Sequence, residues 1–259
     1  MKEKYEHEDS FYKALEQGRI RAYYQPMYTA EGFRIASAEA LCRWEKPDGS
    51  MILPDDFIPM LEKTGEICLL DWHMAERICR LLSEMRYKNM EPVPISLNLS
   101  RRHSEEWDAA EHLASVADAY CLDHRLVEAE ITETYASRDG NLQKMIRKIR
   151  ENGFHVAVDD FGIGQANLSF IHEVGFDILK LDRSLITGSF EDPREEVVVR
   201  SIVKMAEELG LKTVAEGVEN EKQLGFLSCC GCTLLQGDYL CPPLPEDEFV
   251  SLLREDSVT

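Results

Sequence analysis

The chain has 259 residues, 44% of them hydrophobic, and a formal net charge of -19 at pH 7. This length and composition suit one large α/β barrel or two small domains and exclude a wholly disordered chain. The negative charge repels nucleic acid polymers and anionic lipid surfaces, so neither is an expected partner. Residues 1–10 lack the apolar stretch of a signal peptide, and no segment is apolar over a membrane-spanning length. We therefore expect a cytoplasmic protein without membrane insertion.

The first predicted elements are two strands that pair with each other. Residues 20–28 form one apolar run, and residues 36–41 form a second run around Glu39. The segment 19–41 has no room for a helix between these runs. We therefore expect a hairpin whose first strand runs antiparallel to the rest of the sheet.

Helices and strands alternate along the rest of the chain. Apolar residues recur at helical spacing in 71–86, 107–120, 141–151 and 195–209, and further strand-like runs are 93–99, 126–131, 156–158, 178–181, 213–215 and 234–240. Gly153 and Gly210 each end a helix and precede a strand-like run that reaches a carboxylate six residues later.

Eight strands alternating with helices predict one α/β domain over residues 1–259, a TIM-like (β/α)8 barrel. An open doubly wound sheet is the alternative, with the strand ends lining a crevice. No linker divides the chain, and Pro242-Pro243 is interpreted as a turn that follows the last strand.

The cysteines and histidines indicate no metal site. Cys229 and Cys232 have the CxxC spacing of half a zinc site, but no second such pair or nearby His pair completes it. We interpret these cysteines as buried thiols beside a turn glycine. The seven histidines fall in no ligand spacing.

Six strand-like runs instead carry polar side chains that are costly to bury. These side chains are Glu39, Asn98, Glu130, Asp159 with Asp160, Lys180, and Glu216 with Glu219. The carboxyl ends of barrel strands meet at one rim, so we expect these groups to converge. Carboxylate and amide oxygens suit Mg²⁺ or Mn²⁺, and bound cations would make such a cluster of acids favourable. The sequence therefore predicts a two-metal site.

Single residues in this set also have purely structural interpretations. Lys180 and Asp182 could form a simple ion pair, Glu130 and Glu133 could cap a helix, and Asn98 could bond its own turn. Together, these interpretations leave a cluster of acids at one rim unexplained.

The segment Glu39-Ala40-Leu41-Cys42-Arg43-Trp44 resembles the signature of EAL-domain cyclic-di-GMP phosphodiesterases. Further segments match in the family's order: Tyr24-Gln25-Pro26, Pro54, Phe57-Ile58-Pro59, Asn98, Glu130-Ile131-Thr132-Glu133, Asp159-Asp160-Phe161-Gly162, Lys180-Leu181-Asp182, Glu216-Gly217-Val218-Glu219 and Gln236-Gly237. The resemblance covers nearly the whole chain and is far more specific than one three-letter match. It implies hydrolysis of cyclic-di-GMP to linear pGpG by water activated between two Mg²⁺ or Mn²⁺ ions.

The resemblance also implies a role for each matching residue. The metal ligands would be Glu39, Asn98, Glu130, Asp159 and Asp160. The catalytic set would be Lys180, Glu216, Asp160 and Glu133, with Lys180 acting by positioning and electrostatics, Glu216 as general base or as holder of the attacking water, and Glu133 steadying the loop after Asp160. The substrate would be held by Gln25, Leu41, Arg43, Glu219 and Gln236.

The chain departs from the family pattern in three places. Residues 163–168 read Ile-Gly-Gln-Ala-Asn-Leu where the family has Thr-Gly-Tyr-Ser-Ser-Leu, Asp238 replaces a frequent aromatic residue, and Pro242 replaces a frequent basic one. In the family, the first of these segments links the metal site to a dimer interface, so this change concerns regulation and the expected homodimer more than the chemistry. The changes at Asp238 and Pro242 would affect how the guanine base is bound.

Two other functions stay open at this point. One is a catalytically poor module of the same fold that binds cyclic-di-GMP or docks a protein partner. The other is an unrelated barrel hydrolase for another phosphodiester. Whether a regulatory domain or partner acts on the chain also stays open.

Overall fold

The computed structural model describes residues 11–106, 108–132, 140–162, 171, 174–186 and 193–256. Eight strands close into a barrel: β1 (Ile20–Thr29), β2 (Ile35–Glu45), β4 (Ile95–Asn98), β5 (Val127–Thr132), β6 (His155–Phe161), β7 (Ile178–Leu181), β8 (Lys212–Ala215) and β9 (Leu234–Leu235). β1 pairs antiparallel with both β2 and β9, and the other neighbouring barrel strands pair in parallel. The predicted barrel with an antiparallel first strand is confirmed.

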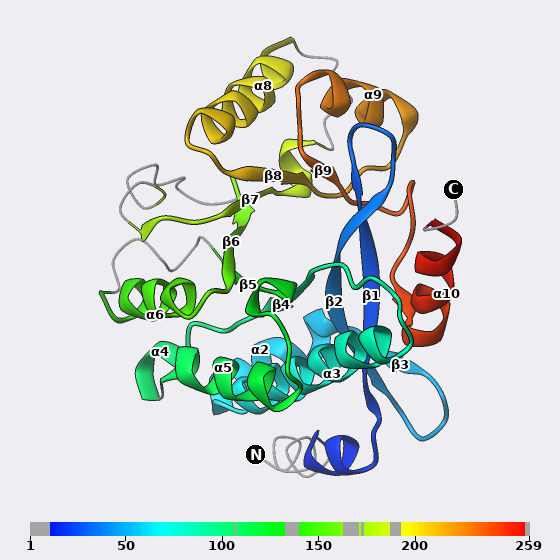
Figure 1. Ribbon diagram of the computed structural model, residues 1–259, viewed down its shortest axis with the longest axis vertical. Coiled ribbons are helices and arrows are strands. Elements are labelled where there is room, and N and C mark those ends of the chain that lie inside the picture. Colours follow the sequence, from blue (N-terminus) through cyan, green and yellow to red (C-terminus); the bar gives the residue numbers. More distant parts are fainter. Residues whose placement is uncertain are drawn as a thin grey trace.

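Helices cover the outside of this barrel. They are α2 (Pro54–Thr64), α3 (Ile67–Tyr87), α4 (His103–Glu106), α5 (Ala109–Ala119), α6 (Gly140–Glu151), α8 (Pro193–Glu208), α9 (Glu221–Cys229) and α10 (Glu246–Asp256). In Figure 1, α10 (red) lies beside β1 (blue), so the last helix closes the barrel against the first strand. The four predicted helices correspond to α3, α5, α6 and α8, whereas α2, α4, α9 and α10 were not predicted. None of the described helices is long and apolar enough to cross a membrane.

The structure corrects two details near the end of the chain. The predicted strand 234–240 is reduced to the two residues of β9, because residues 237–241 form a turn in which the N–H groups of Leu240 and Cys241 both donate to the carbonyl oxygen of Gly237 at 3.0 Å. Pro242-Pro243 does not follow the last strand, because β10 (Leu244–Pro245) comes after it and pairs with β1. A further short strand, β3 (Met51–Ile52), extends the sheet beyond β2.

All eight cysteines are free thiols. Cys232 is buried, and its Sγ donates to the carbonyl oxygen of Leu234 at 3.3 Å. Cys229 is exposed, so the prediction of buried thiols holds for only part of this segment.

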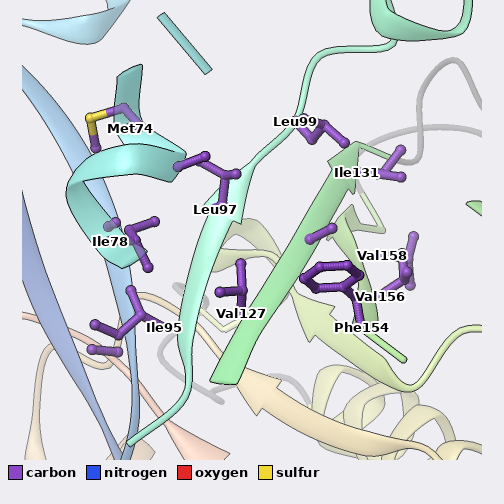
Figure 2. Packing of buried hydrophobic residues seen from close by; sticks show 14 of the residues in the cluster. Met74, Ile78, Ile95, Leu97, Leu99, Val127, Ile131, Phe154, Val156 and Val158 are labelled. Carbon is purple, nitrogen blue, oxygen red and sulfur yellow. The ribbon is translucent and has the colours of Figure 1, made fainter. Parts of the chain in front are cut away.

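Most buried apolar side chains lie between the helices and the outer face of the barrel. In Figure 2, Leu97 of β4 points toward α3, which carries Met74 and Ile78, and Ile95 of β4 belongs to the same packed layer. All four are at most 4% exposed. Burying each such side chain stabilises the fold by about 1.5–3 kcal/mol relative to exposure, so this layer holds α3 firmly against the strands.

The interior of the barrel has an apolar layer and a polar layer. The apolar layer consists of Met27, Ala157, Ile178, Val214 and Leu234. The rim is the end of the barrel where the carboxyl ends of the parallel strands meet. In each case, the residue two positions nearer the rim is polar: Gln25, Asp159, Lys180, Glu216 and Gln236. Side chains two residues apart on a strand share a face, so these groups stand directly above the apolar layer. Glu39, Asn98 and Glu130 complete the polar layer, with one side chain from each of the eight strands or from the residue that follows it.

Candidate active site

The ammonium of Lys180 lies at the centre of the polar layer. Its Nζ is 2.6 Å from Oε1 of Glu216, 2.8 Å from Oε2 of Glu130, 3.2 Å from Oδ1 of Asp159 and 3.3 Å from Oε2 of Glu39. Burial favours the neutral amine, but the four acids hold the pKa of Lys180 well above its ordinary value. Lys180 therefore stays protonated and acts as a fixed positive charge.

The structural interpretations of Lys180, Asn98 and Glu130 do not hold. Oδ1 of Asp182 accepts from the backbone N–H of Ser184 at 2.7 Å instead of pairing with Lys180. Nδ2 of Asn98 donates to Oε1 of Glu39 at 3.1 Å instead of bonding its own turn. Glu130 lies inside β5 and is 2% exposed, so it caps no helix.

The acids around Lys180 carry more negative charge than one ammonium can balance. Burial raises the pKa of Glu216 to about 8 and that of Asp160 to about 6, and nearby carboxylates add to both shifts. Burial also raises the pKa of Glu130 well above its ordinary value. For Glu39, burial acts in the same direction, but Lys180 and amide donors outweigh it and lower the pKa. The cluster has five acids: Glu39, Glu130, Asp159, Asp160 and Glu216. When all five are ionised, they and the Lys180 ammonium carry a net charge that two divalent cations would neutralise.

A bulge allows Asp159 and Asp160 to serve one site. Neighbouring residues on a regular strand point to opposite faces. The pairing of β6 with β7 shifts register between Val158 and Phe161, and Asp160 has φ +59°, the left-handed region. This local irregularity lets both carboxylates line the same pocket.

A chain of amides links the rim to Glu39. Nε2 of Gln236 donates to Oε2 of Glu39 at 2.8 Å and to Oε1 of Gln25 at 3.0 Å. Nε2 of Gln25 in turn donates to Oδ1 of Asp238 at 3.3 Å. Asp238 is thereby tied to the site through two amides.

Gly237 allows the backbone to approach closely beside this chain of amides. A Cβ at this position would lie 2.3 Å from both the backbone N and O of Val218. The backbone N–H of Val218 donates to the carbonyl oxygen of Gln236 at 3.0 Å. Only glycine fits at this position. The close contact holds Gln236 next to the loop that carries Glu219.

The candidate ligands have the donor atoms that divalent metal ions prefer, but their side chains are not positioned around a common metal site. Oε1 of Gln236 is a buried acceptor without a hydrogen-bond partner among the described residues, and Oδ1 of Asp159 has the Lys180 ammonium at 3.2 Å but accepts no hydrogen bond there. All the candidate ligands offer oxygen, which Mg²⁺ and Mn²⁺ prefer. No three Asp, Glu, His or Cys side chains in the described part are arranged as a metal site. The carboxylates instead converge on Lys180, so a metal ion would have to draw some of them away from it.

The polar layer opens into a pocket whose wall includes Leu41, Glu219 and a residue that sequence reasoning missed, Arg183. Nη2 of Arg183 lies 2.8 Å from Oε1 of Glu219, and both residues line the pocket. Gly217 has φ +68°, and a Cβ there would meet Cγ of Arg183 at 2.6 Å. The available signal was the position of Arg183, three residues after Lys180 at the end of a barrel strand.

Two predicted site residues are placed neither in this pocket nor in the polar layer below it. Arg43 does not line it: its Nη1 donates to the carbonyl oxygen of Cys42 at 2.9 Å, and its guanidinium lies 5.8 Å from the ring centroid of Tyr23. Glu133 lies outside the described residues, as does the segment 163–168, so the roles predicted for them stay predictions.

Comparisons with known proteins identify the family. The EAL domain model matches residues 8–243. The chain is 30% identical to the signalling protein YkoW of Bacillus subtilis over 94% of its length, and 29% identical to the probable cyclic di-GMP phosphodiesterase PdeG of Escherichia coli over 95%. It spans only 30% and 49% of these relatives. The structure of the PaMucR phosphodiesterase in complex with c-di-GMP superposes with a TM-score of 0.87 at 30% identity, covering 93% of this chain and 98% of that one. The chain belongs to the EAL domain family.

Proposed function

We propose that the chain is a metal-dependent phosphodiesterase that hydrolyses cyclic-di-GMP to linear pGpG. The observation that carries this proposal is the polar layer, in which acids on or directly after four other strands of the barrel surround Lys180. The names of the similar proteins support it: PdeG is called a probable cyclic di-GMP phosphodiesterase, and PaMucR is a phosphodiesterase seen with c-di-GMP.

The proposed metal ligands are Glu39, Asn98, Glu130, Asp159 and Asp160. Two divalent cations held there would supply an activated water and bind the phosphate oxygens. The negative charge of the cluster favours this role, because isolated carboxylates are costly to keep ionised in a buried site.

Lys180 and Glu216 act on the charge and the proton of the reaction. Lys180 is a fixed cation that stabilises negative charge developing on the phosphate oxygens. Glu216, whose pKa is raised to about 8, is suited to accept and release a proton near neutral pH. It serves either as the general base or as the group that holds the attacking water. Glu133 steadies the loop after Asp160.

The nucleotide occupies the pocket above the polar layer. Gln25, Leu41, Glu219 and Gln236 are in its wall, and Arg183 adds a cation for a phosphate. Arg43 follows Leu41 by two residues on β2, so it shares the strand face of Leu41 and would reach the substrate from the edge of the pocket.

We also propose that the chain forms a homodimer at micromolar concentration. The support is the family resemblance of the segment 163–168, in which Ile163 would replace hydroxyl hydrogen bonding by apolar packing. Sedimentation with a parallel activity assay tests this, and a fully active monomer would contradict it. Restoring Thr at 163 and Tyr at 165 should change the dimer affinity or the rate.

The decisive test of the activity is incubation with cyclic-di-GMP and Mg²⁺ or Mn²⁺, with chromatographic detection of pGpG. A matched pair of variants makes it specific. Glu130→Gln removes a proposed ligand and should lower turnover at least ~100-fold. Glu128→Gln changes a buried acid on the same face of β5, one layer lower, which accepts from Oγ of Ser37 at 3.1 Å. It should keep turnover within a few-fold, and equal loss in both variants, or turnover in excess chelator, would contradict the proposal.

A catalytically poor cyclic-di-GMP-binding module is the second candidate function. The altered sequence of residues 163–168, next to Asp159 and Asp160, favours it. Calorimetric binding of cyclic-di-GMP with no pGpG formed in Mg²⁺ or Mn²⁺ would support this function over the first.

A further inference from the structure

A buried acid–histidine pair lies outside the polar layer, beside the end of β4. Asp71 of α3 is 5% exposed and His103 is 1% exposed. Oδ2 of Asp71 is 2.9 Å from Nε2 of His103 and accepts from the backbone N–H of Ser100 at 2.8 Å. The ring of Trp72 covers the histidine, with 4.4 Å between the centroids. The pair therefore joins α3 to the turn 100–103.

The hydrogen bonds give each member of the pair a defined role. Because the N–H of Ser100 donates to Oδ2, Asp71 acts as an acceptor, and Nε2 of His103 carries the proton that it shares with the same oxygen. Burial raises the pKa of Asp71, so the carboxylate is costly to keep here without these donors. A single oxygen thus ties both ends of the turn 100–103 to α3.

This turn continues directly from the strand that carries Asn98. The N–H of Leu99 donates to the carbonyl oxygen of Glu130 at 2.9 Å, and the N–H of His103 donates to that of Ser100 at 3.2 Å. Asn98, two residues before Ser100, donates to Oε1 of Glu39 at 3.1 Å. The direction of the Asn98 side chain therefore depends on how the turn leaves the strand.

Packing alone does not hold the turn in place. Asp71, Asn98 and Ser100 line one cavity of about 250 Å³ between α2, α3 and the strands. Protein interiors are otherwise close-packed, so a space of this size beside the turn leaves it room to shift. The two hydrogen bonds to Oδ2 of Asp71 tie the turn to α3 beside this space.

We propose that Asp71 and His103 are positioning residues, which hold the turn after β4 so that Asn98 stays against Glu39 and presents its amide oxygen to a divalent cation. The cation rests on the proposed function, whereas the placement of Asn98 does not. Partners one step removed from metal ligands typically contribute 10–100-fold to metal affinity or activity.

Two substitutions separate positioning from simple packing. His103→Leu keeps the bulk but removes the donor, whereas His103→Gln keeps an N–H near the place of Nε2. His112→Leu is the matched control, because His112 also contacts the ring of Trp72, at 4.2 Å between centroids, but is exposed and has no bond to Asp71.

The first readout is the pair of side-chain amide N–H signals of Asn98 in the NMR spectrum of the chelated, nucleotide-free protein, assigned by their loss in Asn98→Asp. In His103→Leu these signals should move toward the values of a free amide, and in His103→Gln and His112→Leu they should stay in place. This measurement needs no metal and no turnover, so its outcome is separate from that of the proposed function. Unmoved signals in His103→Leu would overturn the proposal.

The second readout is calorimetric titration with Mn²⁺, followed by separate kcat and KM values for cyclic-di-GMP. His103→Leu should bind Mn²⁺ about 10–100-fold more weakly and lose kcat, with KM nearly unchanged. His103→Gln should recover most of the affinity. If His103→Leu does not fold, Asp71→Asn provides the same readouts. Wild-type Mn²⁺ affinity in the folded variant, or equal loss in the Gln and Leu variants, would contradict positioning.

Discussion

Nζ of Lys180 lies 2.8 Å from Oε2 of Glu130, and both side chains are at most 2% exposed inside the barrel. This pair is the centre of a cluster whose acids exceed its cations. Removing one partner of a buried ion pair leaves an uncompensated charge and is strongly destabilising, typically by about 3–5 kcal/mol. A substitution of Lys180 therefore tests two roles of this residue, because its effect on stability and its effect on turnover can be measured separately.

Lys180→Met should lower the melting temperature of the chelated protein, because the acids around residue 180 lose their ammonium. Added Mn²⁺ should restore more stability in the variant than in the wild type, since the cation replaces the missing charge. Turnover should stay low while metal occupancy is kept. Differential scanning fluorimetry, calorimetric titration and a pGpG assay measure these outcomes. If the variant no longer binds metal, Lys180 has a structural role in the site.

The stability of the chelated protein should fall as pH rises from about 5 to about 8. Glu216 has its pKa raised from 4.5 to about 8 in the fold, so between these values the folded state binds more protons than the unfolded state. The stability linked to this proton is complete below pH 4.5 and is lost as pH rises through 8. The pKa of Asp160 is raised to about 6, so this residue adds a further loss of stability in the lower part of the same pH range. Melting temperatures measured across this range check the sign, and Glu216→Gln should flatten the curve.

Gly237→Ala should disturb both folding and chemistry. The added methyl would meet the backbone of Val218 at 2.3 Å, and such overpacking costs about 1–3 kcal/mol. The shift would also displace Gln236 from Glu39, so turnover should fall more than stability explains. Gly225→Ala in α9 is the control: nothing lies within 4 Å, and helix propensity favours Ala by about 0.5–1 kcal/mol. Urea denaturation and kinetics on both variants decide between these expectations.

Arg183→Gln should raise KM for cyclic-di-GMP about 10-fold with little change in kcat, because Arg183 is a cation in the pocket wall away from the reacting layer. The effect should shrink at high salt, since exposed charges are screened. Arg21→Gln removes a comparable exposed arginine, paired with Glu45 at 2.6 Å, and should leave KM unchanged. A drop in kcat alone would assign Arg183 to the chemistry instead.

Local patterns along the chain predict much of this molecule. Helical periodicity marked α3, α5, α6 and α8, and short apolar runs marked the barrel strands. Because the carboxyl ends of parallel barrel strands meet at one rim, the polar residues at the ends of these runs could be placed there together. The strand-end groups Glu39, Asn98, Glu130, Asp159 and Lys180 could therefore be assigned to one rim before any contact was known.

Tertiary structure decided which of these groups meet. Barrel closure brings Gln236 of the last strand onto Gln25 and Glu39 of the first two, a contact between residues about 200 positions apart that no local pattern encodes. The bulge that turns Asp160 to the same side as Asp159 depends on its pairing with β7. The bond from Asp71 to His103 arises only when α3 packs on β4. Sequence periodicity predicts which face of a helix or strand a residue occupies, because that face depends on one element alone. Which residues meet across the site depends on how several elements pack together, so periodicity does not predict it.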